Sequence, residues 1–71
     1  MTDAPRHIRA RQWRDDIGIS QSELAKRIGY TARAIRNFES GETQFGPVSD
    51  RSWQRYAMAC QAYAGLDKLP F

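Results

Sequence analysis

The side chains best suited to catalysis or metal binding are scarce in this chain of 71 residues. It holds one histidine, His7, and one cysteine, Cys60, and its carboxylates are scattered along the sequence. Acid–base and nucleophilic chemistry need two or three converging groups, and a zinc site needs closely spaced cysteines and histidines. We therefore predict that the protein is not an enzyme, binds no metal and uses no cofactor. Cys60 is expected to be a small buried hydrophobic residue.

Basic side chains offer a different chemistry, because they attract phosphate groups. The formal net charge is +3, and the positive residues concentrate in the first half of the chain. Between residues 6 and 36 stand eight basic residues against three acidic ones. The eight are Arg6, Arg9, Arg11, Arg14, Lys26, Arg27, Arg33 and Arg36. This distribution is typical of a nucleic-acid-binding protein, although charge alone leaves open a solvated basic face that has no partner.

Other features of the sequence indicate where the protein is located in the cell. A single cysteine cannot form an internal disulfide, the apolar runs are far shorter than a membrane span, and the N-terminus lacks the apolar segment of a signal peptide. We predict a cytoplasmic protein of one small domain, covering residues 6–65, without membrane contact.

The elements that position these side chains begin with one amphipathic helix. Residues 1–5 are short and polar, and we predict that they form a flexible arm. From Arg6 to Ile17, the apolar residues Ala10, Trp13 and Ile17 recur at helical spacing, with charged residues on the other faces. The pattern predicts a helix with these three side chains directed inward.

Two shorter helices follow, separated by a tight turn. Ser20, with a glutamate three residues later, is typical of a capping box at a helix start, and Gly29 is typical of a helix end. Thr31 is the expected N-cap of the next helix, which Gly41 ends. Two short helices joined by a glycine-containing turn are the signature of a helix-turn-helix, here over residues 20–41.

The C-terminal third is predicted to hold a loop, a helix and a tail. Residues 42–49 show no helical period and are expected to form a loop, after which Ser49 or Asp50 caps a helix over about residues 51–64. Apolar residues widen one face of that helix beyond what a small core needs, and residues 66–71 form an apolar tail. The fold class is thus predicted to be all-α, a bundle of four to five helices.

The segment from Ala10 to Gly41 resembles the xenobiotic-response-element type of helix-turn-helix, the lambda-repressor-like family that includes Cro and phage repressors. The matching residues are Trp13-Arg14, Gly18-Ile19-Ser20-Gln21, Glu23-Leu24-Ala25, Ile28-Gly29, Ile35 and Glu39-Ser40-Gly41. The resemblance implies a transcription regulator whose third helix enters the major groove of double-stranded DNA. The C-terminal third matches weakly, because Pro47 stands six residues after Gly41, whereas the family commonly has a proline after four.

The resemblance also implies roles for individual residues. Those expected to contact base edges are Ala32, Arg33, Arg36 and Asn37, since Arg33 suits guanine and Asn37 suits adenine. Those expected to contact phosphates are Gln21, Thr31, Ser40, Thr43, Arg6, Arg9 and Lys26. Arg14 and Glu39 match two family positions that form a partly buried ion pair, so their predicted role is structural.

The partners expected beyond DNA follow from area and from the apolar excess. One small module contacts too few base pairs for high specificity, so we predict a homodimer on an inverted-repeat operator, acting as a small autorepressor of phage or mobile-element type. The residues expected at the dimer interface are Trp53, Tyr56, Cys60, Tyr63, Leu66, Leu69 and Phe71. The alternative is an antitoxin-like module whose main partner is another protein.

Overall fold

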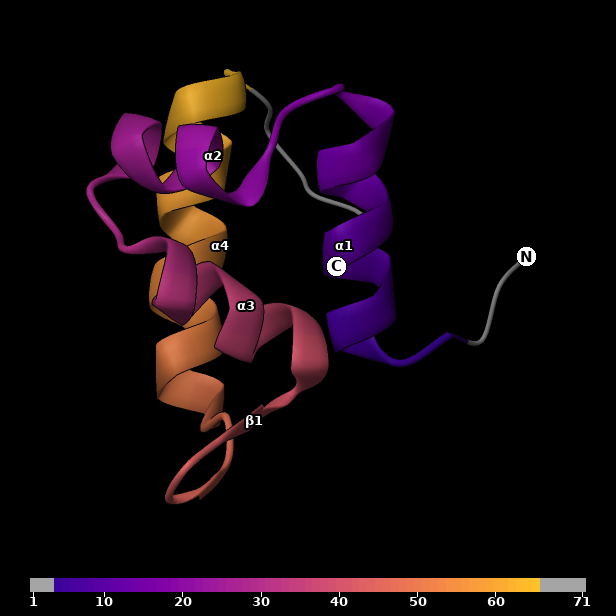
Figure 1. Ribbon diagram of the computed structural model, residues 1–71, viewed down its shortest axis with the longest axis vertical. Coiled ribbons are helices and arrows are strands. Elements are labelled where there is room, and N and C mark those ends of the chain that lie inside the picture. Colours follow the sequence, from indigo (N-terminus) through magenta and orange to yellow (C-terminus); the bar gives the residue numbers. More distant parts are fainter. Residues whose placement is uncertain (1–3, 66–71) are drawn as a thin grey trace.

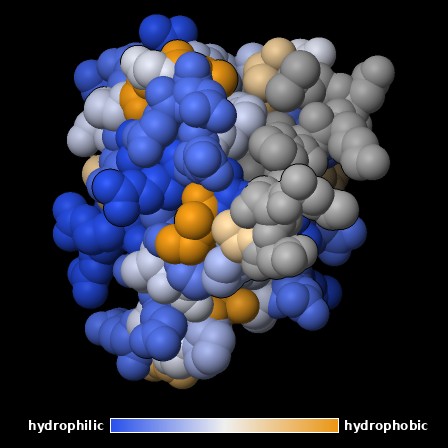
Figure 2. All heavy atoms as spheres, turned by 90° about the vertical axis from the view of Figure 1, so that its right-hand side faces the viewer, coloured by the Kyte–Doolittle hydropathy of each residue, from blue (hydrophilic) through white to orange (hydrophobic). Residues whose placement is uncertain are grey.

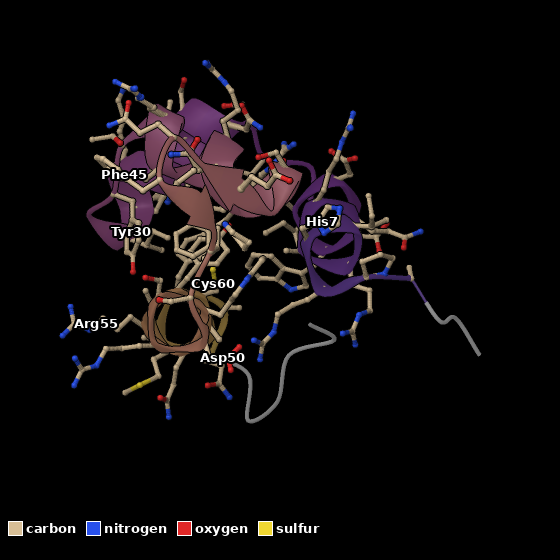
Figure 3. The ribbon with its side chains drawn as sticks, turned by 90° about the horizontal axis from the view of Figure 1, so that it is seen from below. His7, Tyr30, Phe45, Asp50, Arg55 and Cys60 are labelled. Carbon is tan, nitrogen blue, oxygen red and sulfur yellow. The ribbon has the colours of Figure 1, made fainter. Side chains whose placement is uncertain are left out.

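A computed structural model describes residues 4–65, which fold into four helices and one short two-stranded ribbon (Figure 1). The elements are α1 (Arg6–Asp16), α2 (Gln21–Ile28), α3 (Ala32–Ser40), β1 (Glu42–Thr43), β2 (Gly46–Pro47) and α4 (Asp50–Ala64). Figures 1 and 3 together show α2 and α3 as a layer packed across α4, with α1 along one side. The predicted all-α bundle is confirmed.

Hydroxyl side chains begin three of the four helices. Ser20, Thr31 and Ser49 each accept a hydrogen bond from the backbone N–H three residues further on, at 3.0, 3.1 and 3.2 Å. Of the two predicted caps for α4, the structure selects Ser49. Gly29 ends α2 with a φ of 80°, a left-handed conformation that glycine adopts without steric cost, and this permits the tight turn into α3.

The core lies where α1, α2 and α3 meet α4. Its buried apolar residues are Ala10, Trp13, Leu24, Ala25, Ile35, Phe38, Trp53, Tyr56 and Cys60. The rings of Phe38 and Tyr56 stack at a centroid distance of 4.2 Å, and Trp53 meets Phe38 edge to face at 5.1 Å. These aromatic contacts join the inner face of α3 to the first half of α4, which fixes the direction in which the outer face of α3 points.

The prediction that Ile17 lies in the core is wrong. Ile17 was expected inside with Ala10 and Trp13, but its side chain is 44% exposed. The helix ends at Asp16, so Ile17 belongs to the turn that leaves α1. The helical spacing of apolar residues continues to Ile17, but the helix itself ends one residue earlier, so Ile17 is not part of its inward face.

The segment predicted as a loop contains ordered strand pairing. β1 and β2 are antiparallel, with Glu42 opposite Pro47 and Thr43 opposite Gly46. The pairing is too short to leave an alternating sequence pattern, and Gly46 with a φ of 123° completes the turn. The prediction was correct in placing no helix there and wrong in leaving the segment irregular.

Three of the α4 residues predicted at the dimer interface are buried within a single chain. Trp53, Tyr56 and Cys60 are 6%, 0% and 0% exposed, so the prediction that they contact a second protomer is wrong for this fold. The core buries more apolar residues of α4 than the sequence pattern predicted, because α2 and α3 both pack across this helix. Tyr63 remains 38% exposed. The other predicted interface residues, Leu66, Leu69 and Phe71, lie outside the described residues.

Candidate nucleic-acid interface

The outer face of α3 forms an exposed ridge. Arg33 and Arg36 are exposed, and Ala32 and Asn37 are partly exposed, whereas the intervening Ile35 is fully buried. The helical period produces this separation, because the two sets of positions point in opposite directions. All four residues predicted to contact bases are therefore brought together on one face of one short helix.

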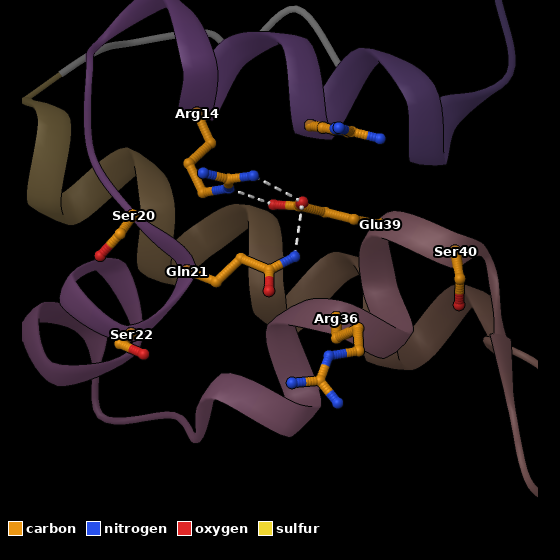
Figure 4. A pocket seen from close by; sticks show the side chains of 8 residues that line it. Arg14, Ser20, Gln21, Ser22, Arg36, Glu39 and Ser40 are labelled. Atoms are coloured by element: carbon orange, nitrogen blue, oxygen red, sulfur yellow. Dashed lines mark hydrogen bonds and ion pairs between the residues drawn. The ribbon is translucent and has the colours of Figure 1, made fainter.

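An open groove of about 680 Å³ runs along one side of this ridge (Figure 4). It lies where α3 faces the start of α2 and the end of α1. Its lining residues are Arg11, Arg14, Ser20, Gln21, Ser22, Arg36, Glu39 and Ser40. Three arginines and three serines against one carboxylate make the groove suited to an anionic, hydrogen-bond-accepting ligand.

The floor of the groove is held by the predicted ion pair. The Arg14 guanidinium donates from Nε to Oε2 of Glu39 at 2.6 Å and from Nη2 to Oε1 at 3.0 Å. The hydrogen bond to Glu39 raises the pKa of Arg14 above its ordinary value. Arg14 Nη1 also donates to the carbonyl oxygen of Ile19 at 2.8 Å, which ties the turn before α2 to α1. The pairing of Arg14 with Glu39 that the family resemblance implies is thus present, and both side chains are buried.

Gln21 joins this pair to the groove. Its Nε2 donates to Oε1 of Glu39 at 3.0 Å, as the dashed line in Figure 4 marks. A carboxamide nitrogen carries two hydrogens, so one serves the carboxylate and the other is left for a ligand. The predicted phosphate donor is thus placed at the start of α2, held by a side chain from the end of α3.

A second, smaller groove of about 300 Å³ borders the opposite side of the ridge. Its lining residues come from α3, the ribbon and the start of α4: Ala34, Asn37, Phe38, Thr43, Pro47, Val48, Ser49 and Ser52. Arg36 lines the first groove and Asn37 the second, so these neighbours on α3 lie on opposite slopes of the ridge. The recognition surface is therefore a helix flanked by a polar groove and a more apolar one.

The three hydroxyl residues predicted to contact phosphates already have partners within the chain. Thr31 caps α3, Ser40 donates to the carbonyl oxygen of Asn37 at 3.0 Å, and Thr43 donates to that of Gly46 at 3.0 Å. Thr31 acts as the acceptor in its capping bond, so its hydroxyl hydrogen is left to donate to a phosphate. A phosphate would have to draw the hydroxyls of Ser40 and Thr43 out of existing hydrogen bonds. Thr31 and Ser40 are exposed, whereas Thr43 is partly buried in the ribbon.

The remaining basic residues of the predicted phosphate set are scattered. Lys26 is exposed on α2, and Arg9 is partly buried on α1. The guanidinium of Arg6 lies 5.3 Å from the centre of the Trp53 ring and borders a hollow formed with α4. The structure therefore does not bring Arg6 together with the recognition face.

The groove also contains residues that sequence reasoning did not assign. Arg11, Ser20 and Ser22 line it beside Gln21, but only their membership of the basic set or of the capping box was recognised. Arg11 lies one helical turn before Asp15, to which it forms an exposed ion pair of 3.9 Å. Its position three residues before Arg14 was the available signal, because such residues share a helix face.

The described surface on the side of α1 is mostly hydrophilic. Figure 2, which looks at the side of α1, shows that on this face most of the described side chains are hydrophilic and that the hydrophobic ones form small separate groups. Among residues 4–65, no group of three or more histidine, cysteine or acidic side chains could hold a metal ion. In the same range, no helix is both long and apolar enough to cross a membrane.

Comparison with known proteins places this arrangement in a family. A family model described as helix-turn-helix matches residues 11–47, more than half of the chain. The match begins in α1, covers α2 and α3, and ends in the ribbon, so it includes the whole lining of the polar groove and the part of the second groove that α3 and the ribbon form. No curated protein and no solved structure matches the chain.

Proposed function

Because the chain belongs to the helix-turn-helix family of the xenobiotic-response-element, lambda-repressor-like type, we propose that it is a sequence-specific DNA-binding repressor that controls its own transcription. DNA binding and transcription regulation are the family's role. The operator, the sign of regulation and the homodimer are our proposal.

The observation that carries this proposal is the ridge of α3 with a groove on either side. The major groove of B-DNA is about 12 Å wide and admits one α-helix, and a sugar–phosphate strand rises on each side of it. When α3 enters the major groove, its two flanking hollows face those two strands. The polar groove, with Arg36, Gln21 and the start of α2, then meets phosphates, which the N-terminal end of a helix also favours.

Base readout is assigned to the outer face of α3. The Arg33 guanidinium has two donors for guanine, the Asn37 carboxamide has a donor and an acceptor for adenine, and Ala32 can touch a thymine methyl. Arg36 completes the set on the slope that faces the polar groove. These four residues would determine the sequence preference.

Phosphate contacts would fix the position of the protein on the duplex. Gln21 has the strongest support, because Glu39 orients its carboxamide and leaves one hydrogen for a phosphate oxygen. Arg11 and Ser22 share the groove with it. Lys26, Arg9, Thr31, Ser40 and Thr43 are secondary candidates, and Arg6 is the weakest because it lies against Trp53.

A homodimer is supported by the small size of one module rather than by a visible interface. A single small domain buries about 600–1,000 Å² on DNA, whereas two copies on an inverted repeat double the readout. Tyr63, partly exposed near the end of α4, and the three apolar residues Leu66, Leu69 and Phe71 remain as the proposed contacts. An antitoxin-like role would need a protein partner instead.

Selection from a random duplex library tests the function. We expect the wild-type protein to enrich one inverted-repeat sequence, to protect a matching site upstream of its own gene in footprinting, and to bind less tightly as salt rises. Equal affinity for selected and unselected duplexes would contradict the proposal. A stable complex with a neighbouring gene product, together with weak DNA binding, would favour the antitoxin-like role.

A further inference from the structure

Phe45 is the most exposed large hydrophobic residue in the described part of the chain. Its side chain is 89% exposed, whereas the next, Met58, is 63% exposed. Exposing a ring of this size to water costs about 1.5–3 kcal/mol relative to burying it. The ring also makes no contribution to the core that would explain its presence. The ring is therefore a candidate for contact with a binding partner.

The ribbon presents the ring in a defined position. Phe45 follows β1, in the turn between the two strands, and its backbone N–H donates to the hydroxyl of Thr43 at 3.1 Å. That hydroxyl in turn donates across the turn to the carbonyl oxygen of Gly46 at 3.0 Å. The backbone N–H of Val48 donates to the carbonyl oxygen of Gly41 at 3.1 Å, which anchors the base of the ribbon to the end of α3.

The ribbon stands beside the recognition helix. Thr43 and Pro47 line the same small groove as Asn37 and Ala34 of α3, so one slope of the ridge and the ribbon enclose one hollow. Figure 3 shows Phe45 at the periphery of the molecule, level with the α2 and α3 layer and away from Arg55 of α4. A strand of DNA that follows this slope of α3 would pass the tip of the ribbon.

We propose that Phe45 is a DNA contact whose ring packs against deoxyribose and base edges of the strand beside the Asn37 slope of α3. This inference rests on the proposed function. The turn from Glu42 to Pro47 carries no positive charge, so its contact with DNA is apolar rather than ionic. Apolar side chains do make such contacts with sugars and base steps. The exposed carboxylate of Glu42 stands at the base of the ribbon, where it directs the tip rather than the base toward the DNA.

The other possible occupant of this surface is a second copy of the chain. Phe45 of one copy could enter the small groove of another, since that hollow is partly apolar. Within the described residues, however, the other exposed large hydrophobic side chains belong to α1, the turn after it and α4, not to the ribbon, and a stable protein interface needs a contiguous apolar patch. Its position beside the recognition helix favours DNA, and the experiment separates the two.

The test uses the full chain and the duplex that the wild-type protein selects from a random library. Phe45→Ala should weaken binding about tenfold, the loss expected when one apolar side chain no longer leaves water. Phe45→Tyr, which keeps the ring, should stay within about twofold, as should Gln44→Ala, the matched exposed neighbour. The thermal midpoint of all three variants should equal that of the wild type, because both side chains are exposed.

Two further readouts identify the type of contact. The salt dependence of Phe45→Ala should keep the wild-type slope, because no phosphate contact is lost. Hydroxyl-radical cleavage should increase only at sugars next to the sequence read by α3, while protection elsewhere remains.

Unchanged affinity and cleavage for Phe45→Ala would overturn the inference. A variant that binds DNA weakly because it sediments as a monomer where the wild type is a dimer would also overturn it, in favour of the protein contact. If the wild type selects no sequence and Arg33→Ala binds like the wild type, the proposed function fails instead. If the wild-type protein binds one sequence specifically, and Arg33→Ala weakens that binding while Phe45→Ala does not, the proposed function stands and the inference fails.

Discussion

Arg14 of α1 and Glu39 of α3 stand 25 residues apart in sequence, and two hydrogen bonds of 2.6 and 3.0 Å join the guanidinium to the carboxylate. The side chains are 11% and 4% exposed. The same carboxylate also accepts from Gln21, so one buried acid connects all three helices that surround the polar groove. The geometry of the recognition surface thus depends on a residue that would not itself touch DNA.

Glu39→Ala should destabilise the fold far more than Arg33→Ala. Removing the carboxylate leaves the buried Arg14 guanidinium with only the exposed carboxylate of Asp15, 3.5 Å from Nη1, as a charged partner. Loss of one partner of a buried pair costs about 3–5 kcal/mol. In a domain of this size, each kcal/mol shifts the thermal midpoint by about 4–8 °C. Arg33 is exposed on α3, so Arg33→Ala should melt within a few degrees of the wild type. Thermal unfolding followed by circular dichroism measures both.

A control for this prediction is Glu23→Ala. Glu23 also accepts from an arginine, Arg27, at 2.9 Å, but that pair is exposed and lies within one helix. Its loss should lower the midpoint only slightly, since exposed pairs contribute little. Equal shifts for the Glu39 and Glu23 variants would show that burial of the Arg14 pair has no energetic consequence.

Arg33→Ala should reduce sequence discrimination rather than general DNA binding. We expect a loss of about 1–3 kcal/mol on the selected duplex and a smaller loss on random DNA, because the guanidinium reads a base edge. Lys26→Ala, which removes an exposed charge on α2, should weaken both DNAs by the same factor. Fluorescence anisotropy at several salt concentrations gives both ratios. A loss for Arg33→Ala that is the same on both duplexes would assign Arg33 to phosphate.

Half-site spacing tests the proposed homodimer. Two recognition helices related by a two-fold axis should sit about 34 Å apart and meet successive major grooves on one face of the duplex. An insertion of about five base pairs between the half-sites turns one of them to the far side, so tight binding should be lost, whereas about ten base pairs should restore part of it. Retained affinity at every spacing would instead describe a monomeric reader.

Cys60 should be unreactive while the protein is folded. Its side chain is fully buried, and burial raises the pKa of the thiol from 9.0 to about 11. The thiolate that reacts with disulfide reagents is therefore scarce at pH 8. We expect the rate of labelling by such a reagent to follow the fraction of unfolded protein as urea is added. Rapid labelling without denaturant would contradict the burial of Cys60.

The same shift makes stability dependent on alkaline pH. The unfolded chain releases the thiol proton from about pH 9, whereas the folded chain keeps it to about pH 11, so the free energy of unfolding falls as the pH rises between these values. Each pH unit in that window removes at most about 1.4 kcal/mol. Urea unfolding at pH 8 and 10 should show a larger decrease for the wild type than for Cys60→Ala. Parallel decreases would mean that the thiol titrates alike in both states.

The sequence by itself determined where the two helices of the helix-turn-helix begin and end. Ser20 and Thr31 begin α2 and α3 as predicted, because capping depends on a hydroxyl and a backbone N–H only three residues apart. Gly29 and Gly41 end the same helices for an equally local reason. Arg14 and Glu39 were paired through a family resemblance, since nothing local links residues so distant in the chain.

Only the tertiary structure decided which surfaces remain free. The apolar stripe of α4 has the same pattern whether it faces a core or a partner, and the packing of α2 and α3 across it settled that Trp53, Tyr56 and Cys60 are buried. The grooves beside α3 arise from three helices and a ribbon at once, so no single segment encodes them. The exposure of Phe45 likewise depends on a two-residue strand pairing, which is too short to leave a periodic signal in the sequence.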